Sequence, residues 1–523
     1  MEDEVKEECA VAGVSLQNDL RSHPEGGAAY YLYEMLLQMQ NRGQLAAGIT
    51  TYNQNRMHVI DTRKKIGTVS ELFATSIKPK AQAIMRKYSG TKGIGHTRYS
   101  TSGGDDEESA QPFESRSSKK WKWFSFSFNG NIANYPELKK EMESKGYRLK
   151  MNLDTEVILY YLAKAQEKDK GADLGDVFAG LSEKFDGAYN IAYMDAQGRM
   201  AVMRDPMGIR PMTYAIDVGF AAAASETVAL ANFVSNEPLS LKPGEMLISE
   251  NGNVEVKRYA KSAKNAHCMF EYVYFASAAS TLDGKSVYET RWKLGVELAK
   301  QESLKVNDRD FVVVPVPDTA KPAADGYAQT IGIPAMEGLI RNRWHFGRTF
   351  IESGDRMSMM KQKFNINTVA LKNKEVILVD DSIVRGTTSK FLVDYLREKG
   401  NVKKIHMRVT CPPIRSPCFY GIDMSTVGEL IANRHSNPEQ LQRTGWSDLD
   451  DDVIEKIAQE IGVDSLRYIN LNGLEKAIGF ENGRKDMCTA CITGIYPTAC
   501  GSALREKALK NYESKTEANR TYA

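Results

Sequence analysis

The sequence predicts a mixed α/β protein of two to four domains, with a parallel α/β sheet in its carboxy-terminal half. Its 523 residues exceed the length of one typical domain. The amino-terminal half opens with a plausible buried strand at 10–16. From about residue 285, apolar runs typical of buried strands alternate with helix-prone segments. The strands begin at Phe311 and cover 376–379, and the helices cover 291–300 and 321–330.

Composition and charge narrow the classes of partner. The chain is 42% hydrophobic and 26% charged, as in ordinary globular proteins, and its formal net charge is +2. We therefore expect neither nucleic acid nor an anionic membrane as a partner. No apolar run reaches the roughly 18 to 20 residues that span a bilayer, and the acidic start lacks the apolar core of a signal peptide. We expect a cytoplasmic protein whose seven cysteines stay reduced.

Cys9 is the candidate nucleophile of the amino-terminal half. It follows a short charged leader and directly precedes the strand at 10–16. Removal of residues 1–8 as a propeptide would give Cys9 a free α-amino group with a pKa of about 7.7 to 8.0. One residue would then supply both the nucleophile and the base. The alternative is a buried, inert cysteine near the N-terminus.

Residues 375–389 combine a buried strand, an acidic pair and a hydroxyl-rich turn. The acidic pair follows the apolar run at 376–379, at the end of a strand where open α/β sheets bind ligands. Backbone N–H groups before the next helix form a seat for phosphate, and the carboxylates can hold ribose hydroxyls or hydrated Mg²⁺. A phosphorylated ribose would use all of these groups; the alternative is an ordinary strand–turn–helix with a solvated acidic pair. The predicted site consists of Asp380, Asp381, Ser382, Arg385, Gly386, Thr387 and Thr388.

Several segments of the amino-terminal half, taken together, resemble one known class of enzyme domain. In order and spacing they are similar to the glutaminase domain of N-terminal-nucleophile (class II) glutamine amidotransferases. The resemblance implies a four-layer αββα sandwich over residues 9–260, after a propeptide at 1–8. The segments that carry it are 42–49, 95–103, 128–132, 153–156, 204–211, 225–227 and 243–245.

This resemblance assigns roles to four further residues. Arg98 would bind the α-carboxylate of glutamine, and Asp154 would bind its α-ammonium group. Asn129 and the backbone N–H of Gly130 would form an oxyanion hole, whose donors contribute about 2.7 to 4 kcal/mol each. The alternatives are a structural ion pair between Arg98 and Asp154 and a hairpin turn at residues 129–130.

The segment 375–389 resembles the phosphoribosylpyrophosphate (PRPP) signature of type I phosphoribosyltransferases. The resemblance implies an α/β domain of that type over 261–440, with Mg²⁺ near Thr319, Asp380 and Asp381. Residues 338–351 are similar to the strand and mobile loop that cover PRPP in this class. The alternative for the arginines there is a solvated basic edge. Further implied PRPP contacts are Tyr288, Arg341, Arg343 and Arg348.

A glutaminase followed by a phosphoribosyltransferase is the order found in glutamine PRPP amidotransferases, a family that the chain resembles from about residue 9 to 500. The implied reaction is glutamine + PRPP + H₂O → 5-phosphoribosylamine + glutamate + pyrophosphate, the first committed step of de novo purine synthesis. Homodimers or homotetramers and inhibition by purine nucleotides are also implied. The alternatives are a divergent paralogue with another phosphoribosyl acceptor and a non-catalytic PRPP or redox sensor.

Four cysteines call for a chemical explanation. Four thiolates suit an iron–sulfur cluster or Zn²⁺ equally well by ligand count. The resemblance favours a structural [4Fe–4S] cluster that ties a helical tail at 441–523 to the rest of the chain. Cys411 and Cys500 are expected to be plain thiols. The implied cluster ligands are Cys268, Cys418, Cys488 and Cys491.

The chain departs from the family pattern at a few positions. Ala10 stands where the family has glycine, and Leu45-Ala46 replaces Glu-Ser in the glutamine pocket. The segment 277–279, Ser-Ala-Ala, replaces Arg-Pro-Asp. These changes fall in the glutamine pocket and at contacts between domains, and they remove none of the residues assigned to catalysis.

Overall fold

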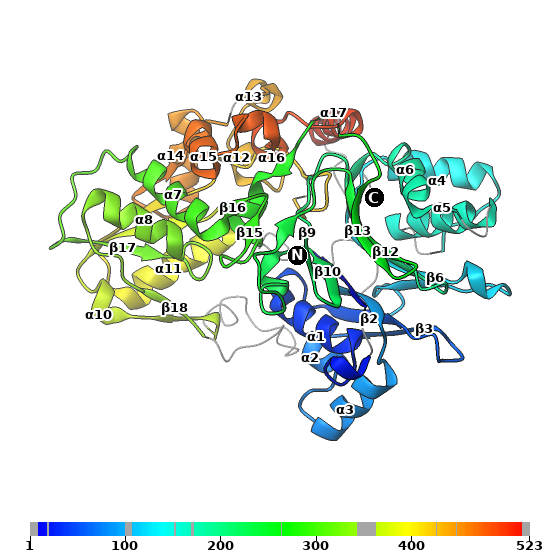
Figure 1. The fold of residues 1–523 in the computed structure, drawn as a ribbon. Coiled ribbons are helices and arrows are strands. Elements are labelled where there is room, and N and C mark those ends of the chain that lie inside the picture. The colour runs from blue at the N-terminus through cyan, green and yellow to red at the C-terminus, as the bar shows by residue number, and fades with distance from the viewer. Residues whose placement is uncertain are drawn as a thin grey trace.

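The computed structural model describes residues 9–17, 20–99, 107–150, 153–168, 172–262, 264–342, 362–424, 426–445 and 447–514. Two regions lie side by side, one built on antiparallel sheets and one on a parallel sheet (Figure 1). No helix of the described residues is long and apolar enough to cross a bilayer.

The first region contains two antiparallel sheets. One sheet has the strand order β11-β9-β10-β1-β4-β2-β3, and the other has the order β13-β12-β8-β7-β6-β5. The strands of the first are β1 (Ala10–Leu16), β2 (Ala46–Tyr52), β3 (Ile60–Ile66), β4 (Lys92–Arg98), β9 (Thr213–Asp217), β10 (Phe220–Ala224) and β11 (Leu239–Ser240). Those of the second are β5 (Phe113–Ser115), β6 (Phe124–Ile132), β7 (Gly187–Asp195), β8 (Met200–Arg204), β12 (Glu245–Glu250) and β13 (Asn253–Arg258).

Helices cover the outer faces of both sheets, which makes four layers. Apolar side chains of α1 and α2 pack on the first sheet, and those of α4, α5 and α6 pack on the second. Between the sheets lies a shared core that includes Val11 and Val202, and a Cβ added at Gly13 would come within 2.5 Å of Val202 Cγ2. The expected αββα sandwich is therefore confirmed. The helices are α1 (Ala28–Gln38), α2 (Val69–Leu72), α3 (Lys78–Lys87), α4 (Tyr135–Ser144), α5 (Asp154–Lys168) and α6 (Leu174–Ser182).

The second region is built on a four-stranded parallel sheet in the order β17-β20-β21-β22. Its strands are β17 (Phe311–Pro315), β20 (Glu375–Asp380), β21 (Lys404–Val409) and β22 (Ser465–Tyr468). Its helices are α7 (Val287–Ala299), α8 (Lys321–Ile331), α10 (Thr368–Leu371), α11 (Thr387–Gly400), α12 (Ile431–Arg434), α13 (Pro438–Gln442), α14 (Asp451–Ile461) and α15 (Leu471–Ile478). Two further ribbons are β15 (Thr281–Leu282) with β16 (Lys285–Ser286), and β18 (Leu339–Arg341) with β19 (Phe364–Ile366).

The sheet extends past the expected domain end at residue 440. Strand β22 pairs in parallel with β21, from His406 opposite Ser465 to Val409 opposite Tyr468. Its connection through α14 packs Val453, Ile457 and Ile461 into the core of the sheet. Residues 441–468 therefore continue the α/β domain and are not part of a separate tail.

The last part of the chain returns to the start of the second region. Strand β23 (Met487–Cys488) pairs in parallel with β14 (His267–Cys268), and α16 (Ala490–Thr493) and α17 (Ala499–Glu513) follow. Helix α17 buries Leu504, Ala508 and Leu509. The polar composition of the sequence after residue 503 predicts a frayed helix. That prediction is wrong, because these side chains form one apolar stripe that packs on the core.

Candidate active sites

Cys9 lies directly before β1, whose first residue pairs with Thr97 near the end of β4. Its Sγ lies 3.8 Å from the backbone oxygen of Tyr99. Burial raises the pKa of the Cys9 thiol, and the positive charge of Arg98 lowers it by a smaller amount. The thiol therefore stays protonated near neutral pH, and a nucleophile at this position needs an adjacent base.

Strand β6 presents an unused hydrogen-bond donor. Asn129 is 2% exposed, and its Nδ2 is buried without a hydrogen-bond partner among the described residues. Gly130 follows with φ +144°, and a Cβ there would lie 1.9 Å from the oxygen of Ala188. Buried polar groups are rarely left unpaired, so a free amide beside an obligate glycine fits a place where a negative oxygen binds.

Two charged residues flank the thiol. Arg98 ends β4 and is buried, and Asp154 is the first residue of α5. Both charges act on the Cys9 thiol, Arg98 lowering its pKa and Asp154 raising it, which brings the predicted glutamine-binding pair and the thiol into one neighbourhood. Burial raises the pKa of Asp154 to about 6, although N–H groups of Ile132 and Thr155 bind its carboxylate.

Two buried hydroxyls next to the residues of this site were not predicted from the sequence. Thr97 precedes Arg98 on β4, and Thr155 follows Asp154 on α5. The Oγ1 atoms of both are buried without a partner in the described part of the chain. They are candidates for polar contacts to a small ligand. In a single sequence, nothing distinguishes a threonine that contacts a ligand from one with only a structural role.

The acidic pair of the second region ends β20. Asp380 and Asp381 are 7% and 6% exposed. The hydroxyls of Thr319 and Ser382 donate to the Asp381 carboxylate, Ser382 at 2.6 Å, and the Asp381 N–H donates to Asp380 Oδ1 at 2.9 Å. Burial raises the pKa of both carboxyls, and the charge of Asp381 raises that of Asp380 further. The pair therefore favours a cation or hydroxyl donors as ligands.

Arg291 on α7 is a neighbour of the pair that sequence reasoning missed. It is 3% exposed, and its positive charge lowers the pKa of Asp381. The same helix carries the predicted contact Tyr288 in its first turn, half exposed. The sequence marked residue 291 only as the start of a helical segment, because a buried arginine has no local pattern.

The turn after the acidic pair is built to begin a helix. Gly386 has φ +82° and directly precedes α11, whose first residues are Thr387 and Thr388. A Cβ at Gly386 would lie 2.4 Å from Ile431 Cδ1. The first N–H groups of an α-helix lack intrahelical acceptors and favour phosphate. Arg385 forms an ion pair with Glu429 at 3.2 Å, which helps to hold the turn.

The basic segment expected to cover PRPP is only partly described. Arg341 ends β18, and its Nη1 lies 3.4 Å from Asp318 Oδ2, next to Thr319. Arg341 therefore lies on the same side as the hydroxyl that binds Asp381. Arg343 and Arg348 lie outside the described residues.

The four expected cluster cysteines are buried in one core. Cys268 and Cys488 are partners across β14 and β23, and the carbonyl of Cys491 accepts the N–H groups of Arg415 and Ser416. Burial raises the pKa of each thiol, and neighbouring thiols raise those of Cys268, Cys488 and Cys491 further. Within the described ranges, no three His, Cys, Asp or Glu side chains converge on one point as a single metal ion would require. Four buried thiols in one core match the donor set of an iron–sulfur cluster and equally that of zinc.

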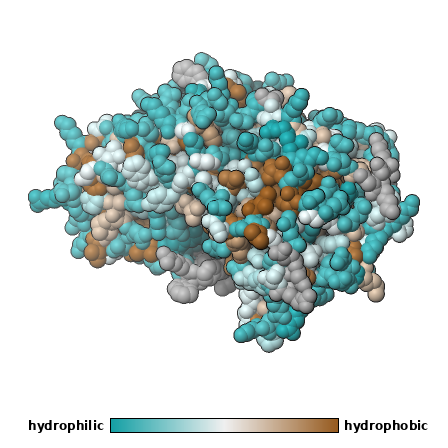
Figure 2. Space-filling model, viewed as in Figure 1, coloured by the Kyte–Doolittle hydropathy of each residue, from teal (hydrophilic) through white to brown (hydrophobic). Residues whose placement is uncertain are grey.

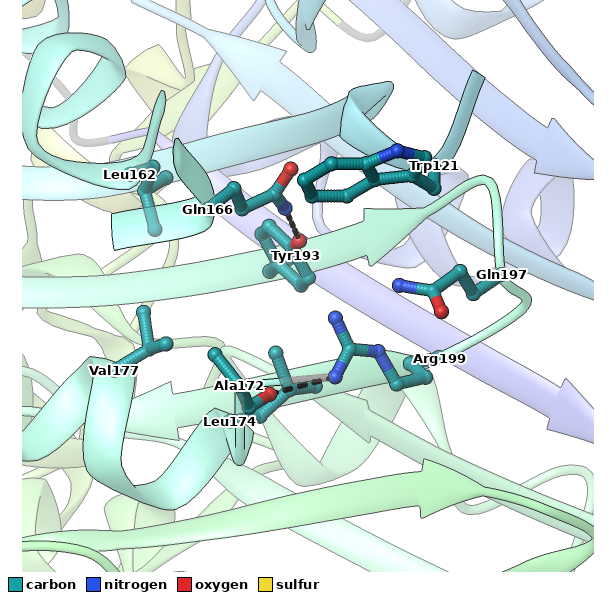
Figure 3. Close-up of a pocket in the computed structure, with 9 residues that line it drawn as sticks. All are labelled: Trp121, Leu162, Gln166, Ala172, Leu174, Val177, Tyr193, Gln197 and Arg199. Atoms are coloured by element: carbon teal, nitrogen blue, oxygen red, sulfur yellow. Dashed lines mark hydrogen bonds between the residues drawn. The ribbon is translucent and has the colours of Figure 1, made fainter. Parts of the chain in front are cut away.

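One small cavity lies apart from both sites. It has a volume of about 10 Å³, enough for about one water molecule, and lies between β7 and helices α5 and α6 (Figure 3). Gln166 donates to the hydroxyl of Tyr193 at its wall, while Gln166 Oε1 is buried without a partner among the described residues. A single bound water would satisfy this oxygen, so the cavity is not a substrate site.

The fold and these two sites define a class of protein: an N-terminal-nucleophile glutamine amidotransferase joined to a type I phosphoribosyltransferase. The model of a glutamine amidotransferase domain matches residues 96–232. The amidophosphoribosyltransferase of Methanothermobacter thermautotrophicus is 37% identical over 512 residues, which cover 97% of this chain and 98% of that protein. That of Bacillus subtilis is 34% identical over 94% of this chain and 95% of its own.

Solved structures agree with the sequence relatives. The glutamine PRPP amidotransferase of B. subtilis, in complex with ADP and GMP, is 33% identical and superposes with a TM-score of 0.78 over 94% of this chain and 98% of that one. The chain belongs to the amidophosphoribosyltransferase family.

Proposed function

We propose that the chain transfers the amide nitrogen of glutamine to C1 of PRPP, releasing glutamate and pyrophosphate and forming 5-phosphoribosylamine. The observation that carries this proposal is direct contact between the oxyanion strand and the second region. Asn131 Nδ2 donates to the oxygen of Phe419 at 3.0 Å, and a Cβ at Gly421 would lie 3.0 Å from the carbonyl of Gly130. Ammonia released at the first site would therefore leave beside the domain that binds PRPP.

In the glutaminase step, Cys9 attacks the side-chain amide of glutamine. Loss of residues 1–8 supplies the α-amine that takes the thiol proton, which the raised pKa of the thiol makes necessary. Arg98 and Asp154 hold the α-carboxylate and α-ammonium groups, and Asn129 Nδ2 with the Gly130 N–H stabilises the oxyanion. Water then hydrolyses the glutamyl thioester.

In the transfer step, the turn at residues 382–388 binds the 5′-phosphate and Asp380 and Asp381 bind the ribose side of PRPP. Thr319 and the two carboxylates fit Mg²⁺, which prefers oxygen ligands and takes one or two carboxylates together with substrate phosphates. When bound, Mg²⁺ would neutralise charge on the leaving pyrophosphate. Arg341, Arg343 and Arg348 would provide further positive charge, and Tyr288 and Arg385 would line the site.

The reaction is tested by isotope transfer. Glutamine labelled with ¹⁵N at its amide is supplied with PRPP and Mg²⁺, and phosphoribosylamine is trapped and analysed by mass spectrometry. We expect the label on the anomeric nitrogen and a mature chain that starts at Cys9. Labelled ammonia with no labelled phosphoribosylamine would reject the proposed acceptor. A chain that starts at Met1 and releases no glutamate would favour a sensor.

We further propose a structural [4Fe–4S] cluster on Cys268, Cys418, Cys488 and Cys491. The burial of all four thiols in one core, with the charges of neighbouring thiols acting on Cys268, Cys488 and Cys491, supports it. Protein purified without oxygen should be brown and hold about four irons per chain. Cys488→Ser should lose the iron, and Cys411→Ser, a change at a buried thiol outside the set, should keep it. A colourless zinc protein would reject the cluster.

Regulation, assembly and location complete the proposal. The B. subtilis structure holds ADP and GMP, which supports inhibition of this chain by purine nucleotides. The visible face in Figure 2 is mostly hydrophilic, with a hydrophobic area near its centre. The exposed side chains Ile216, Val218 and Leu239 near the edge strand β11 support self-association as a homodimer or homotetramer. We expect a cytoplasmic enzyme, and light scattering with and without GMP measures the assembly.

A further inference from the structure

Four charged side chains form a buried ion-pair group between the two regions. It consists of Arg42, Glu226, Glu271 and Arg210, none more than 1% exposed. Arg42 binds Glu226 through Nε and Glu271 through Nη2 at 2.6 Å and Nη1 at 3.2 Å. Arg210 Nη1 lies 3.6 Å from Glu271 Oε1. Two positive and two negative charges balance, but burying four charges is costly, so stability alone is a poor explanation for the group.

Each arginine of the group reaches one half of the glutamine site. Arg42 precedes Gly43, and a Cβ at Gly43 would lie 2.6 Å from the carbonyl carbon of Arg98. The backbone next to Arg42 is therefore packed against the residue that holds the glutamine carboxylate. Arg210 donates to the oxygen of Tyr420 through Nε at 3.0 Å and Nη2 at 2.6 Å. The next residue, Gly421, lies against Gly130 of the oxyanion hole.

Glu271 joins this group to the second region. It is the first residue of a π-helical turn, Glu271–Phe275. Arg291 donates to the carbonyls of Tyr272 and Tyr274 in this turn and to that of Ala276 directly after it. The same Arg291 lies close enough to Asp381 to lower its pKa. Short π-helical turns occur often at functional sites.

Glu226 fixes the segment that follows the turn. Its Oε2 accepts the N–H of Ser277 at 2.8 Å and the hydroxyl of Ser280 at 2.7 Å. This segment is where the chain departs from the family at 277–279. The contacts to Glu226 use one backbone N–H and one hydroxyl, so the segment stays attached to the group without the arginine and aspartate that the family has there.

We propose that Glu271 is a positioning residue for glutamine hydrolysis. Through Arg42 it fixes the backbone beside Arg98, and through Arg210 and Tyr420 it fixes the strand of the oxyanion hole. Because Glu271 also begins the turn whose carbonyls Arg291 binds, the ion-pair group sets the geometry of the glutamine site from the side of the second region. This inference rests on the proposed function for the identity of the glutamine site, but glutamate release tests it without any PRPP product.

The test compares Glu271→Gln with a matched control, Glu302→Gln. Glu302 is also buried and paired with an arginine, Arg408, at 2.6 Å, but it lies within the second region. We measure glutamate release from glutamine, the ammonia-dependent reaction with PRPP, and the melting temperature for both variants. A misplacement of about 1 Å can cost about 100-fold in rate. We therefore expect Glu271→Gln to lower kcat/KM for glutamine by about 10-fold to 100-fold.

The control separates positioning from loss of stability. Glu302→Gln should lower the melting temperature by a similar amount and leave kcat/KM for glutamine within about twofold of wild type, since a residue outside the site moves no reacting group. Ammonia-dependent synthesis should stay close to wild type in both variants. Equal kcat/KM for glutamine in the two variants at equal melting temperatures would overturn the proposal.

A second variant covers the case in which Glu271→Gln does not fold. Arg42→Lys keeps the charge but cannot bind both glutamates with a planar fork. It should lower kcat/KM for glutamine in the same direction by a smaller factor, and an unchanged value would also overturn the proposal. If wild-type protein releases glutamate but forms no phosphoribosylamine, the proposed acceptor fails while both comparisons remain valid for the inference.

Discussion

In the first region, the candidate residues come from separate elements, whereas in the second region most of them come from one strand–turn–helix. Cys9 precedes β1, Arg98 ends β4, Asn129 lies on β6 and Asp154 begins α5. Residues 380–388 follow one another between β20 and α11. The glutamine site therefore exists only when both antiparallel sheets are assembled, while the PRPP site is largely a property of one local segment.

This difference changes what holds each site. The glutamine site depends on contacts made at long range, such as the packing of Gly43 on the backbone of Arg98 and of Gly421 on Gly130. The acidic pair is held by near neighbours, since Ser382 and the backbone of Asp381 itself bind the carboxylates. Thr319, at the end of the neighbouring strand β17, adds one contact from a distance. We expect distant substitutions to affect glutamine chemistry more than PRPP binding.

The broadest expected effect comes from the acidic pair of the second region, because both the glutamine-dependent and the ammonia-dependent reaction need it. Asp380→Asn combined with Asp381→Asn removes both negative charges at the PRPP site. The substitutions keep the size of the side chains and their ability to form hydrogen bonds. Synthesis from glutamine and from ammonia should both fall below about 1% of wild type, because the two carboxylates are the main ligands for the ribose and Mg²⁺. Product formation from both nitrogen sources and PRPP binding by calorimetry measure the effect. Unaltered PRPP affinity would reject the assignment of the acidic pair.

Replacing the thiol should abolish the glutamine-dependent reaction and leave the ammonia-dependent reaction largely intact. Cys9→Ala removes the nucleophile, so glutamine-dependent synthesis should fall by at least about 1,000-fold. Ammonia-dependent synthesis should stay within about threefold, since the PRPP site lies in the other region. Both rates are measured on the same preparation. Loss of the ammonia reaction as well would contradict two separate sites and break the comparison drawn above.

The sequence predicted the second site from its own residues because the strand, acidic pair and turn are contiguous. The apolar run at 376–379, the glycine at 386 and the helix-prone residues after it are local signals, and the structure places β20, Gly386 and α11 there. The glutamine site carried a local signal only at Cys9, which follows a short charged leader and precedes a strand. Its other residues were predicted because several separate segments resemble those of a known class in their order.

Features that depend on distant pairing were missed for the same reason. Strand β22 has only four residues, alternates partly buried and buried positions and contains Arg467, so nothing local marks it as a strand of a parallel sheet. The pairing of Cys268 with Cys488 joins positions far apart in the chain. The buried hydroxyls of Thr97 and Thr155 are visible only once their surroundings are known. The helix after residue 503 is an exception. The apolar spacing of Leu504, Ala508 and Leu509 is a local signal from which a packed helix could have been predicted.

The oxyanion residue should show an intermediate effect confined to one reaction. Asn129→Ala removes the unpaired Nδ2 donor, and loss of one such donor costs about 100-fold to 1,000-fold in kcat. We expect that loss for glutamine-dependent synthesis, with KM for glutamine changed by less than about threefold, because the donor acts on charge that develops during reaction. Asn131 lies on the same strand as Asn129 and binds the oxygen of Phe419. Asn131→Ala breaks that contact and is the control for local packing. A rise in KM at constant kcat would instead make Asn129 a binding residue.

The smallest expected effect is a pH dependence of glutamine binding. Burial raises the pKa of Asp154 to about 6, so its carboxyl is mostly ionised at pH 7 and mostly protonated at pH 5. Only the ionised form attracts the α-ammonium of glutamine. The Kd should therefore increase by about tenfold per pH unit below about pH 6 and stay flat above it. Calorimetry on the Cys9→Ala protein, between pH 5 and pH 8, avoids both hydrolysis and titration of the thiol. Asp154→Asn should bind glutamine weakly at every pH, without the break near pH 6. A break near pH 4 in the Cys9→Ala protein would mean that the Asp154 carboxyl is solvated and keeps its ordinary pKa. The glutamine site would then be open to water and not enclosed by the two sheets around it.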